Sequence, residues 1–149
     1  MQTTNIRRAS AADLDALVPL FDAYRVFYAQ PSDPVRARDF LAERFANMDS
    51  VVLLAERGAS VLGFTQLYPI FSSVRTARTW LLNDLFVTDG ARRSGVARAL
   101  LDAAAGFARE QGAAGVMLET TRDNAPARAL YRAAGWNEDE SQWYSVSTR

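Results

Sequence analysis

The stretch that decides the fold is LLNDLFVTDGARRSGVARALL, residues 81–101. Its first seven residues, Leu81 to Val87, are apolar on both faces, which is typical of a strand covered on both sides. Asp89-Gly90 then signals a turn. From Val96 onward, apolar residues recur at the spacing of a helix that packs one face against a core. The stretch therefore predicts a buried strand, a short loop and an amphipathic helix.

The loop between this strand and this helix, Arg92 to Ala97, is suited to an anion. A helix N-terminus presents unpaired N–H groups and a partial positive charge, both of which favour phosphate. Gly95 lets the backbone come close to a ligand, and the small Ala97 leaves the next turn uncrowded. The alternative interpretation is a surface arginine pair beside a glycine that merely eases the start of the helix.

Two motifs resemble those of the GNAT superfamily of N-acetyltransferases. Residues 92–97, RRSGVA, have the form (Gln/Arg)-x-x-Gly-x-(Gly/Ala) and resemble the acetyl-CoA pyrophosphate loop of that superfamily. Residues 124–136, NAPARALYRAAGW, match its Asn-x-x-Ala-x-x-Leu-Tyr-x-x-x-Gly-(Phe/Trp) segment. The motifs stand in the family's order with a helix and a strand between them, so the resemblance covers nearly the whole chain.

Length and composition limit the chemistry. The 149 residues predict a single domain, residues 1–149, and neither a membrane-spanning run nor a signal-peptide pattern is found, so we expect a cytoplasmic protein. A net charge of zero gives no electrostatic case for nucleic acid or a membrane as partner. The chain has no Cys, His or Lys, which excludes thiol nucleophiles, histidine bases, disulfides and Schiff bases, and we expect no metal.

Periodicity and turn signals predict an order of strand, two helices, three strands, helix, strand, helix, strand. The expected helices span residues 11–28, 35–45, 96–111 and 125–134; the expected strands span 5–9, 50–57, 60–68, 81–87, 115–121 and 140–148. Ser10 and Asp13 form a capping-box variant, and Pro69 falls near the end of the third strand. The fold class is mixed α/β rather than doubly wound. The resemblance implies a GNAT fold: four helices and a mixed, mostly antiparallel sheet of six to seven strands, splayed between strands 4 and 5.

The resemblance also implies acetyl-CoA as cosubstrate, with direct transfer of the acetyl group to an amine. The absence of Cys fits direct transfer, since no acyl-cysteine can form. In the implied binding mode, pantetheine pairs with the strand residues Leu85, Phe86 and Val87. The phosphates contact the loop residues Arg92, Arg93, Ser94, Gly95, Val96, Ala97 and Arg98. Asn124 and Arg128, from the second motif, also contact the cofactor. For Arg98 an ion pair with Asp102 is the favoured alternative, and Asn124 can also be a helix N-cap.

The catalytic candidates are Tyr131, Asn83 and Asp84. A phenol, with a pKa near ~10, can protonate a departing thiolate, although Tyr131 can also be a core aromatic. The sequence Leu-Asn-Asp-Leu-Phe-Val resembles the Leu-Glu-Asp-(Leu/Phe)-Phe-Val of spermidine/spermine acetyltransferases, with Asn83 in place of the Glu. We therefore expect the amine's proton to leave through a water held near Asn83 and Asp84. Strict alternation along the strand points Asp84 to the face opposite that of Asn83, and only a β-bulge would turn both side chains to the same side.

The acceptor is predicted to be a primary amine, and a small molecule. Tyr24, Tyr28 and Asn83 are the substrate-binding candidates, although tyrosines at helical spacing can equally be core residues, and Trp143 and Tyr144 carry the same ambiguity. A protein or peptide acceptor remains an alternative, as does a CoA-binding sensor without turnover, which the missing Glu favours. A homodimer is implied only as a habit of the family.

Overall fold

The computed structural model describes residues 3–149, which form two compact units, one running to Glu119 and the other from Thr120 to Arg149. The first unit contains a sheet with the strand order β1-β2-β3-β4-β5. Its strands are β1 (Asn5–Arg8), β2 (Val51–Arg57), β3 (Ser60–Ser72), β4 (Ala77–Val87) and β5 (Val116–Met117). Neighbours are antiparallel from β1 to β4, whereas β4 and β5 are parallel.

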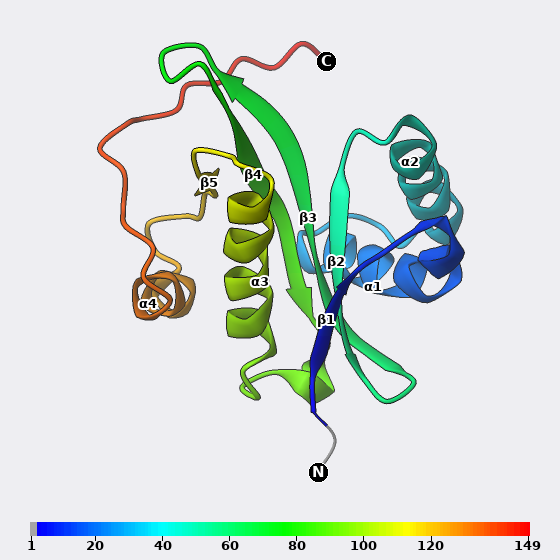
Figure 1. The fold of residues 1–149 in the computed structure, drawn as a ribbon. Helices are drawn as coiled ribbons and strands as arrows, with labels where there is room; N and C mark the ends of the chain where they lie inside the picture. The colour runs from blue at the N-terminus through cyan, green and yellow to red at the C-terminus, as the bar shows by residue number, and fades with distance from the viewer. Residues whose placement is uncertain (1–2) are drawn as a thin grey trace. The chain divides into compact units, whose positions relative to one another are not determined.

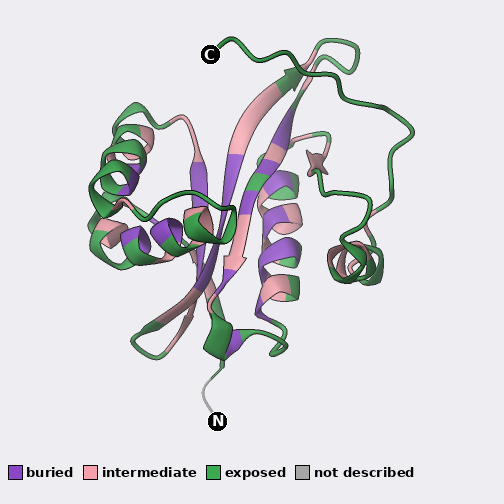
Figure 2. Ribbon diagram, turned by 180° about the vertical axis from the view of Figure 1, so that it is seen from behind, coloured by how far each residue is buried: buried purple, intermediate pink, exposed green. Residues whose placement is uncertain are grey.

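Helices cover both faces of this sheet (Figure 1). Helices α1 (Leu14–Phe27) and α2 (Pro34–Asn47) lie on one face, and α3 (Val96–Glu110) lies on the other. The core under α1 and α2 gathers Leu17, Phe21, Leu41, Leu54 and Phe64. The inner side of α3 is buried, as Figure 2 shows, through Val96, Leu100, Leu101, Ala104 and Ala108. Coverage on both sides explains why β4 reads as a largely apolar run.

Capping residues mark the N-terminal ends of the first two helices, and the first of these caps was predicted. Ser10 and Asp13 form the reciprocal capping box around a short 3-10 turn, Ala11–Asp13, that leads into α1. The side chain of Asp33 caps α2, and Pro34 occupies its first turn, where a missing N–H costs nothing. The four predicted α-helices are confirmed, with shifts of up to three residues at their ends.

The β3–β4 hairpin is longer than predicted. Strand β3 continues to Ser72, so Pro69 lies inside the strand, and its expected place near the strand end is wrong. Pro69 is tolerated inside β3 because β2 aligns with β3 only as far as Leu67. Beyond that point β3 has β4 alone as its neighbour, and a residue without an N–H is tolerated on the vacant edge.

The second unit contains α4 (Ala125–Ala133), which ends before Gly135 in a left-handed conformation (φ 86°). The predicted strand 140–148 is wrong: residues 137–149 are irregular and exposed, with Trp143 at 73% and Tyr144 at 90%. This segment begins with the acidic run Glu138-Asp139-Glu140, and no alternating face of it is buried. The predicted strand 115–121 is reduced to two residues. Within residues 3–149 the sheet therefore has five strands, not the six to seven expected.

Candidate active site

A β-bulge lies in the middle of β4 and decides where Asp84 points. Gln66 is aligned with Asp84, but its neighbour Leu67 is aligned with Leu82, so Asn83 is an extra residue on β4. Without the bulge, Leu82 and Asp84 would share a face. With it, Asp84 moves to the face of Gln66, the side covered by α1. The prediction from strict alternation is therefore wrong at Asp84, because the bulge exists.

Asp84 is the centre of a buried hydrogen-bond network. Gln66 donates from Nε2 to Oδ2 of Asp84 at 2.6 Å, and Asn83 donates from Nδ2 to Oδ1 at 2.9 Å. Behind it, Ser50 donates from Oγ to Oε1 of Gln66 at 2.9 Å. Asp84 is 4% exposed and Gln66 is fully buried. Burial raises the pKa of Asp84, and the hydrogen bonds from Gln66 and Asn83 oppose this rise only in part.

Aromatic side chains from the end of α1 lie beside this network. The Tyr24 hydroxyl donates to the carbonyl oxygen of Asn83 at 3.4 Å, and its ring packs edge-on against Phe86 and Tyr28. Burial and the charge of Asp84 raise the pKa of Tyr24, so this phenol stays protonated. Tyr28 and Phe27 are more than half exposed. Tyr24 is therefore a core residue through its ring, and its hydroxyl also reaches β4 beside the substrate-binding candidate Asn83.

The loop that leads into α3 has the backbone of an anion site. Gly95, the N-cap residue of α3, is left-handed (φ 82°), and no side chain caps the helix. The first turn of α3 carries no acidic residue, so its free N–H groups and the helix dipole meet no internal negative charge. Arg93 is also left-handed (φ 63°) and exposed. These residues fit a pyrophosphate, which is the group the loop motif implies.

The three arginines of this loop have different surroundings. Arg92 donates from Nε to the carbonyl oxygen of Val87 at 3.1 Å, and its guanidinium lies over the rings of Phe27 and Phe86. Arg98 pairs with Asp102 one turn on, as its alternative interpretation predicts. Arg93 has no ion pair within the part of the chain that the structure describes. Arg92 thus ties the loop to β4 and α1.

Strand β4 has an edge that β5 does not cover. Among residues 3–149, β5 aligns with β4 only at Trp80 and Leu81, whereas β4 continues to Val87. The predicted pantetheine-pairing residues Leu85, Phe86 and Val87 lie on this extension, which agrees with the expected separation of strands 4 and 5. Backbone groups on such an edge are available to an extended ligand.

The second unit holds the other predicted residues. Asn124 accepts a hydrogen bond from the Ala127 N–H and so caps α4. Arg128 donates to the carbonyl oxygen of Arg122 at 2.9 Å and lies 3.6 Å from Glu138. Tyr131 lies in the last half of α4 and is half-buried. Asn124 and Arg128 therefore have structural roles within this unit.

Sequence reasoning missed Gln66 and Ser50. Gln66 could have been found, because it is a polar residue between Thr65 and Leu67 in a buried strand. A buried polar side chain is costly unless it is hydrogen-bonded or functional, and this argument also singles out Asn83 and Asp84. Ser50 carries no comparable signal, since its contact with Gln66 depends on the tertiary arrangement. No cluster of three metal-ligating side chains is present in residues 3–149, and no helix there is long and apolar enough to cross a membrane.

Comparisons with known proteins identify the family and the fold. A model of the Acetyltransferase (GNAT) family matches residues 15–136. The chain is 47% identical over 135 residues to the uncharacterized N-acetyltransferase YhfO of Bacillus subtilis, with 91% of each chain covered. A crystal structure of a probable acetyltransferase has a TM-score of 0.92 at 40% identity, covering 97% of this chain and 98% of that one. The fold is shared by a predicted acetyltransferase of Clostridium acetobutylicum solved with acetyl-CoA (TM-score 0.77, 18% identity, coverage 97% and 96%).

The chain belongs to the GNAT family of acetyltransferases. It is an enzyme of the N-acetyltransferase class, and members of this family use acetyl-CoA.

Proposed function

We propose that this enzyme transfers an acetyl group from acetyl-CoA directly to the primary amine of a small molecule. The observation that carries the proposal is the bulge at Asn83, which turns the buried carboxylate of Asp84 toward the aromatic side chains at the end of α1. Acetyl-CoA supplies the acetyl group as a thioester.

In this proposal, the loop before α3 and the free edge of β4 bind the cofactor. The uncapped N-terminus of α3, Gly95 and Arg93 would hold the pyrophosphate, because they combine free amides, a left-handed turn and an unpaired positive charge. The backbone of residues 85–87 would pair with the pantetheine arm. Arg92 fixes the position of the loop against Val87.

Amine binding falls to Asp84 and the exposed rings. A primary aliphatic amine has a pKa near ~10.4 and carries a positive charge at neutral pH. A carboxylate attracts this charge, and the faces of Tyr28 and Phe27, both more than half exposed, attract cations as well. A compact cationic amine with an apolar body fits this combination.

The proton of the amine passes, in this proposal, through a water beside Asn83 to the carboxylate of Asp84. The amide N–H of Asn83 is engaged by Asp84, so its oxygen remains to hold the water. A carboxylate whose pKa is raised by burial is a stronger base than an ordinary aspartate. Tyr131 then protonates the departing thiolate. Asn83 stands where the spermidine/spermine acetyltransferases have a Glu, and this difference is what makes the water route necessary.

The test is release of CoA thiol from acetyl-CoA with a panel of acceptors. The panel holds aliphatic diamines, aromatic monoamines such as tyramine, and short peptides with free N-termini; a reaction without acceptor gives the background. We expect turnover above background with small amines. Turnover with peptides alone would establish the protein-acceptor alternative instead, and tight acetyl-CoA binding without any turnover would establish the sensor alternative, which the absence of the Glu favours.

A further inference from the structure

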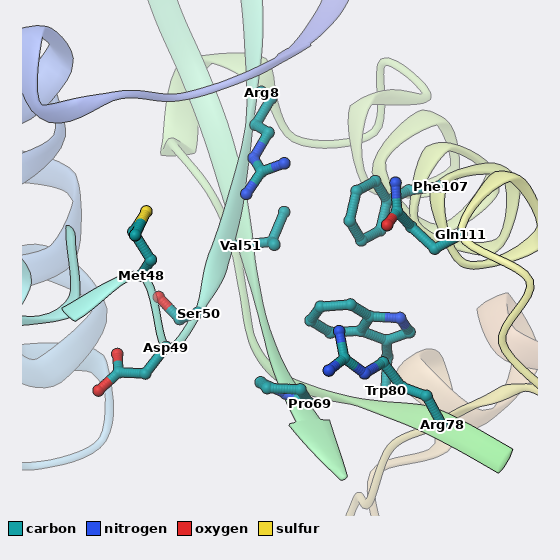
Figure 3. Close-up of a pocket in the computed structure, with 10 residues that line it drawn as sticks. All are labelled: Arg8, Met48, Asp49, Ser50, Val51, Pro69, Arg78, Trp80, Phe107 and Gln111. Atoms are coloured by element: carbon teal, nitrogen blue, oxygen red, sulfur yellow. The ribbon is translucent and has the colours of Figure 1, made fainter. Parts of the chain in front are cut away.

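A pocket lies in the first unit, on the face of the sheet that α3 covers. Its volume is about 170 Å³, and its walls include Val51, Pro69, Trp80 and Phe107, with the side chains of Arg8 and Arg78 at its rim. Trp80 and Phe107 meet edge to face, with ring centroids 5.2 Å apart. Figure 3 shows the two guanidinium groups approaching the space between these walls from opposite sides.

This pocket is separate from the candidate active site. Trp80 is aligned with Pro69 and contacts α3, so both face α3, whereas the bulge turns Asp84 to the face covered by α1. The pocket is also remote from the phosphate loop, because Phe107 and Val96 are eleven residues apart on α3, or about 16 Å along the helix axis. The proposed acetyl transfer therefore leaves the pocket unexplained.

The charges around the pocket are unbalanced. Neither Arg8 nor Arg78 makes an ion pair within residues 3–149; their guanidinium groups lie over aromatic rings, Arg8 over Phe107 and Arg78 over Trp80. The acid in the lining, Asp49, lies 3.2 Å from the Nε of Arg44, and Figure 3 shows its carboxylate turned away from the other side chains. Two guanidinium groups that face one space repel each other, and an anion between them removes that repulsion.

Trp80 adds an independent observation. It is 4% exposed, and its indole Nε1 is buried without a hydrogen-bond acceptor among the described residues. Buried donors are nearly always paired, so this unpaired N–H is sensitive to any change in its surroundings. Arginine forks match carboxylates in shape, and aromatic walls match a flat apolar ring.

We propose that this pocket binds a small aryl carboxylate, with its ring against Trp80, Phe107 and Pro69 and its carboxylate between Arg8 and Arg78. The size is consistent, because a cavity of about 150 Å³ in another protein holds benzene. A site of this kind gives the enzyme a ligand other than its two substrates.

Benzoate is the probe, and the indole N–H signal of Trp80 in a ¹⁵N-correlated NMR spectrum is the readout; Trp80→Phe identifies that signal among the three tryptophans. We expect a saturable shift with a dissociation constant on the order of 1 mM. Arg8→Gln and Arg78→Gln should each weaken binding about tenfold, since each removes a charged hydrogen-bond donor. Arg36→Gln, at an exposed arginine on α2, is the matched control and should leave binding unchanged.

Benzamide is the neutral counterpart of benzoate and needs no variant. It should bind the wild-type protein at least about tenfold more weakly, because benzamide carries no negative charge to neutralise the two guanidinium groups. The proposal is overturned if the Trp80 signal does not move with benzoate, if benzamide binds as well as benzoate, or if both arginine variants, shown to be folded by their thermal melts, keep the wild-type affinity.

Discussion

Gln66 and Asp84 face each other across the β3–β4 pair, and the Nε2 of Gln66 donates to Oδ2 of Asp84 at 2.6 Å. This pair exists because Asn83 is an extra residue on β4. Burial makes the charged form of Asp84 costly, and the hydrogen bond from Gln66 offsets part of that cost. The hydrogen bond from Gln66 therefore lowers the basicity of Asp84 and, in the proposed mechanism, the pH at which the amine's proton can be removed.

Replacing Gln66 by Leu should shift the pH dependence of kcat/KM. The variant keeps a similar volume but removes a donor from the carboxylate, so the pKa of Asp84 rises further and the rising limb of kcat/KM moves to higher pH. Ser50→Ala loosens Gln66 without touching Asp84, so a smaller shift in the same direction is expected. A Gln66→Leu profile that coincides with wild type would show that Gln66 only packs.

Replacing Gly95 by Glu should weaken acetyl-CoA binding at least about tenfold, or ~1.4 kcal/mol. The added carboxylate would lie at the uncapped start of α3, where the pyrophosphate is expected. Gly95→Gln is the matched control, because both variants bear the same strain at φ 82° and only one bears a charge. Calorimetry on folded proteins measures both. Equal affinities in the Glu and Gln variants would contradict a phosphate at this loop.

Replacing Tyr131 by Phe should lower kcat by about 10²–10⁴-fold, the usual value of general acid catalysis, with acetyl-CoA affinity nearly unchanged. Only a hydroxyl is removed, so the packing of α4 is kept. Tyr144→Phe is the control, since Tyr144 is 90% exposed and lies in the same unit. A kcat within about twofold of wild type, where chemistry limits the rate, would make Tyr131 a packing residue.

Replacing Asp13 by Asn should lower the free energy of unfolding by about 1 kcal/mol at neutral pH. Hydrogen bonds from Arg7 lower the pKa of Asp13 from 3.8 to about 2, and the 40% exposure of the Arg7 side chain limits the gain. Because the folded-state pKa is the lower one, this stabilisation is complete above about pH 4 and is lost as the pH falls toward 2.

Urea unfolding at several pH values measures this difference between wild type and Asp13→Asn. The difference should close near pH 2. Asp15→Asn is the control, because the Asp15 side chain is 91% exposed and its pair with Arg38 should contribute less than about 0.5 kcal/mol. A difference that stays the same at pH 2 would mean that the charge of Asp13 is not what stabilises the fold.

The fold could be predicted as far as local signals determine it. The capping box at Ser10, the proline at the start of α2 and the glycine before α3 are short-range features, and the corresponding elements are confirmed. The number of strands could not be predicted from such signals. A strand exists only where another strand pairs with it, and residues 140–148 have aromatic and β-branched residues without such a partner.

In the site, too, local features could be predicted from the sequence, whereas features that depend on strand pairing could not. The composition of residues 92–97 was enough to predict an anion loop, because a left-handed glycine before a helix is a local feature. The orientation of Asp84 depends on a bulge, and a bulge is a property of two strands in register, which alternation along one strand does not contain. For this reason the role of Asp84 could be argued only after the pairing of Gln66 was known.

The most direct test of the account is the pH profile of kcat/KM for one good amine, measured with wild type and with Asp84→Asn. Wild-type kcat/KM should rise as Asp84 loses its proton, at a pH above that of an ordinary aspartate, and should level before the amine's own titration at ~10.4. In Asp84→Asn this limb should be absent. A profile that instead climbs along the titration of the free amine, equally in both proteins, would contradict the assignment of Asp84 as the group that receives the proton.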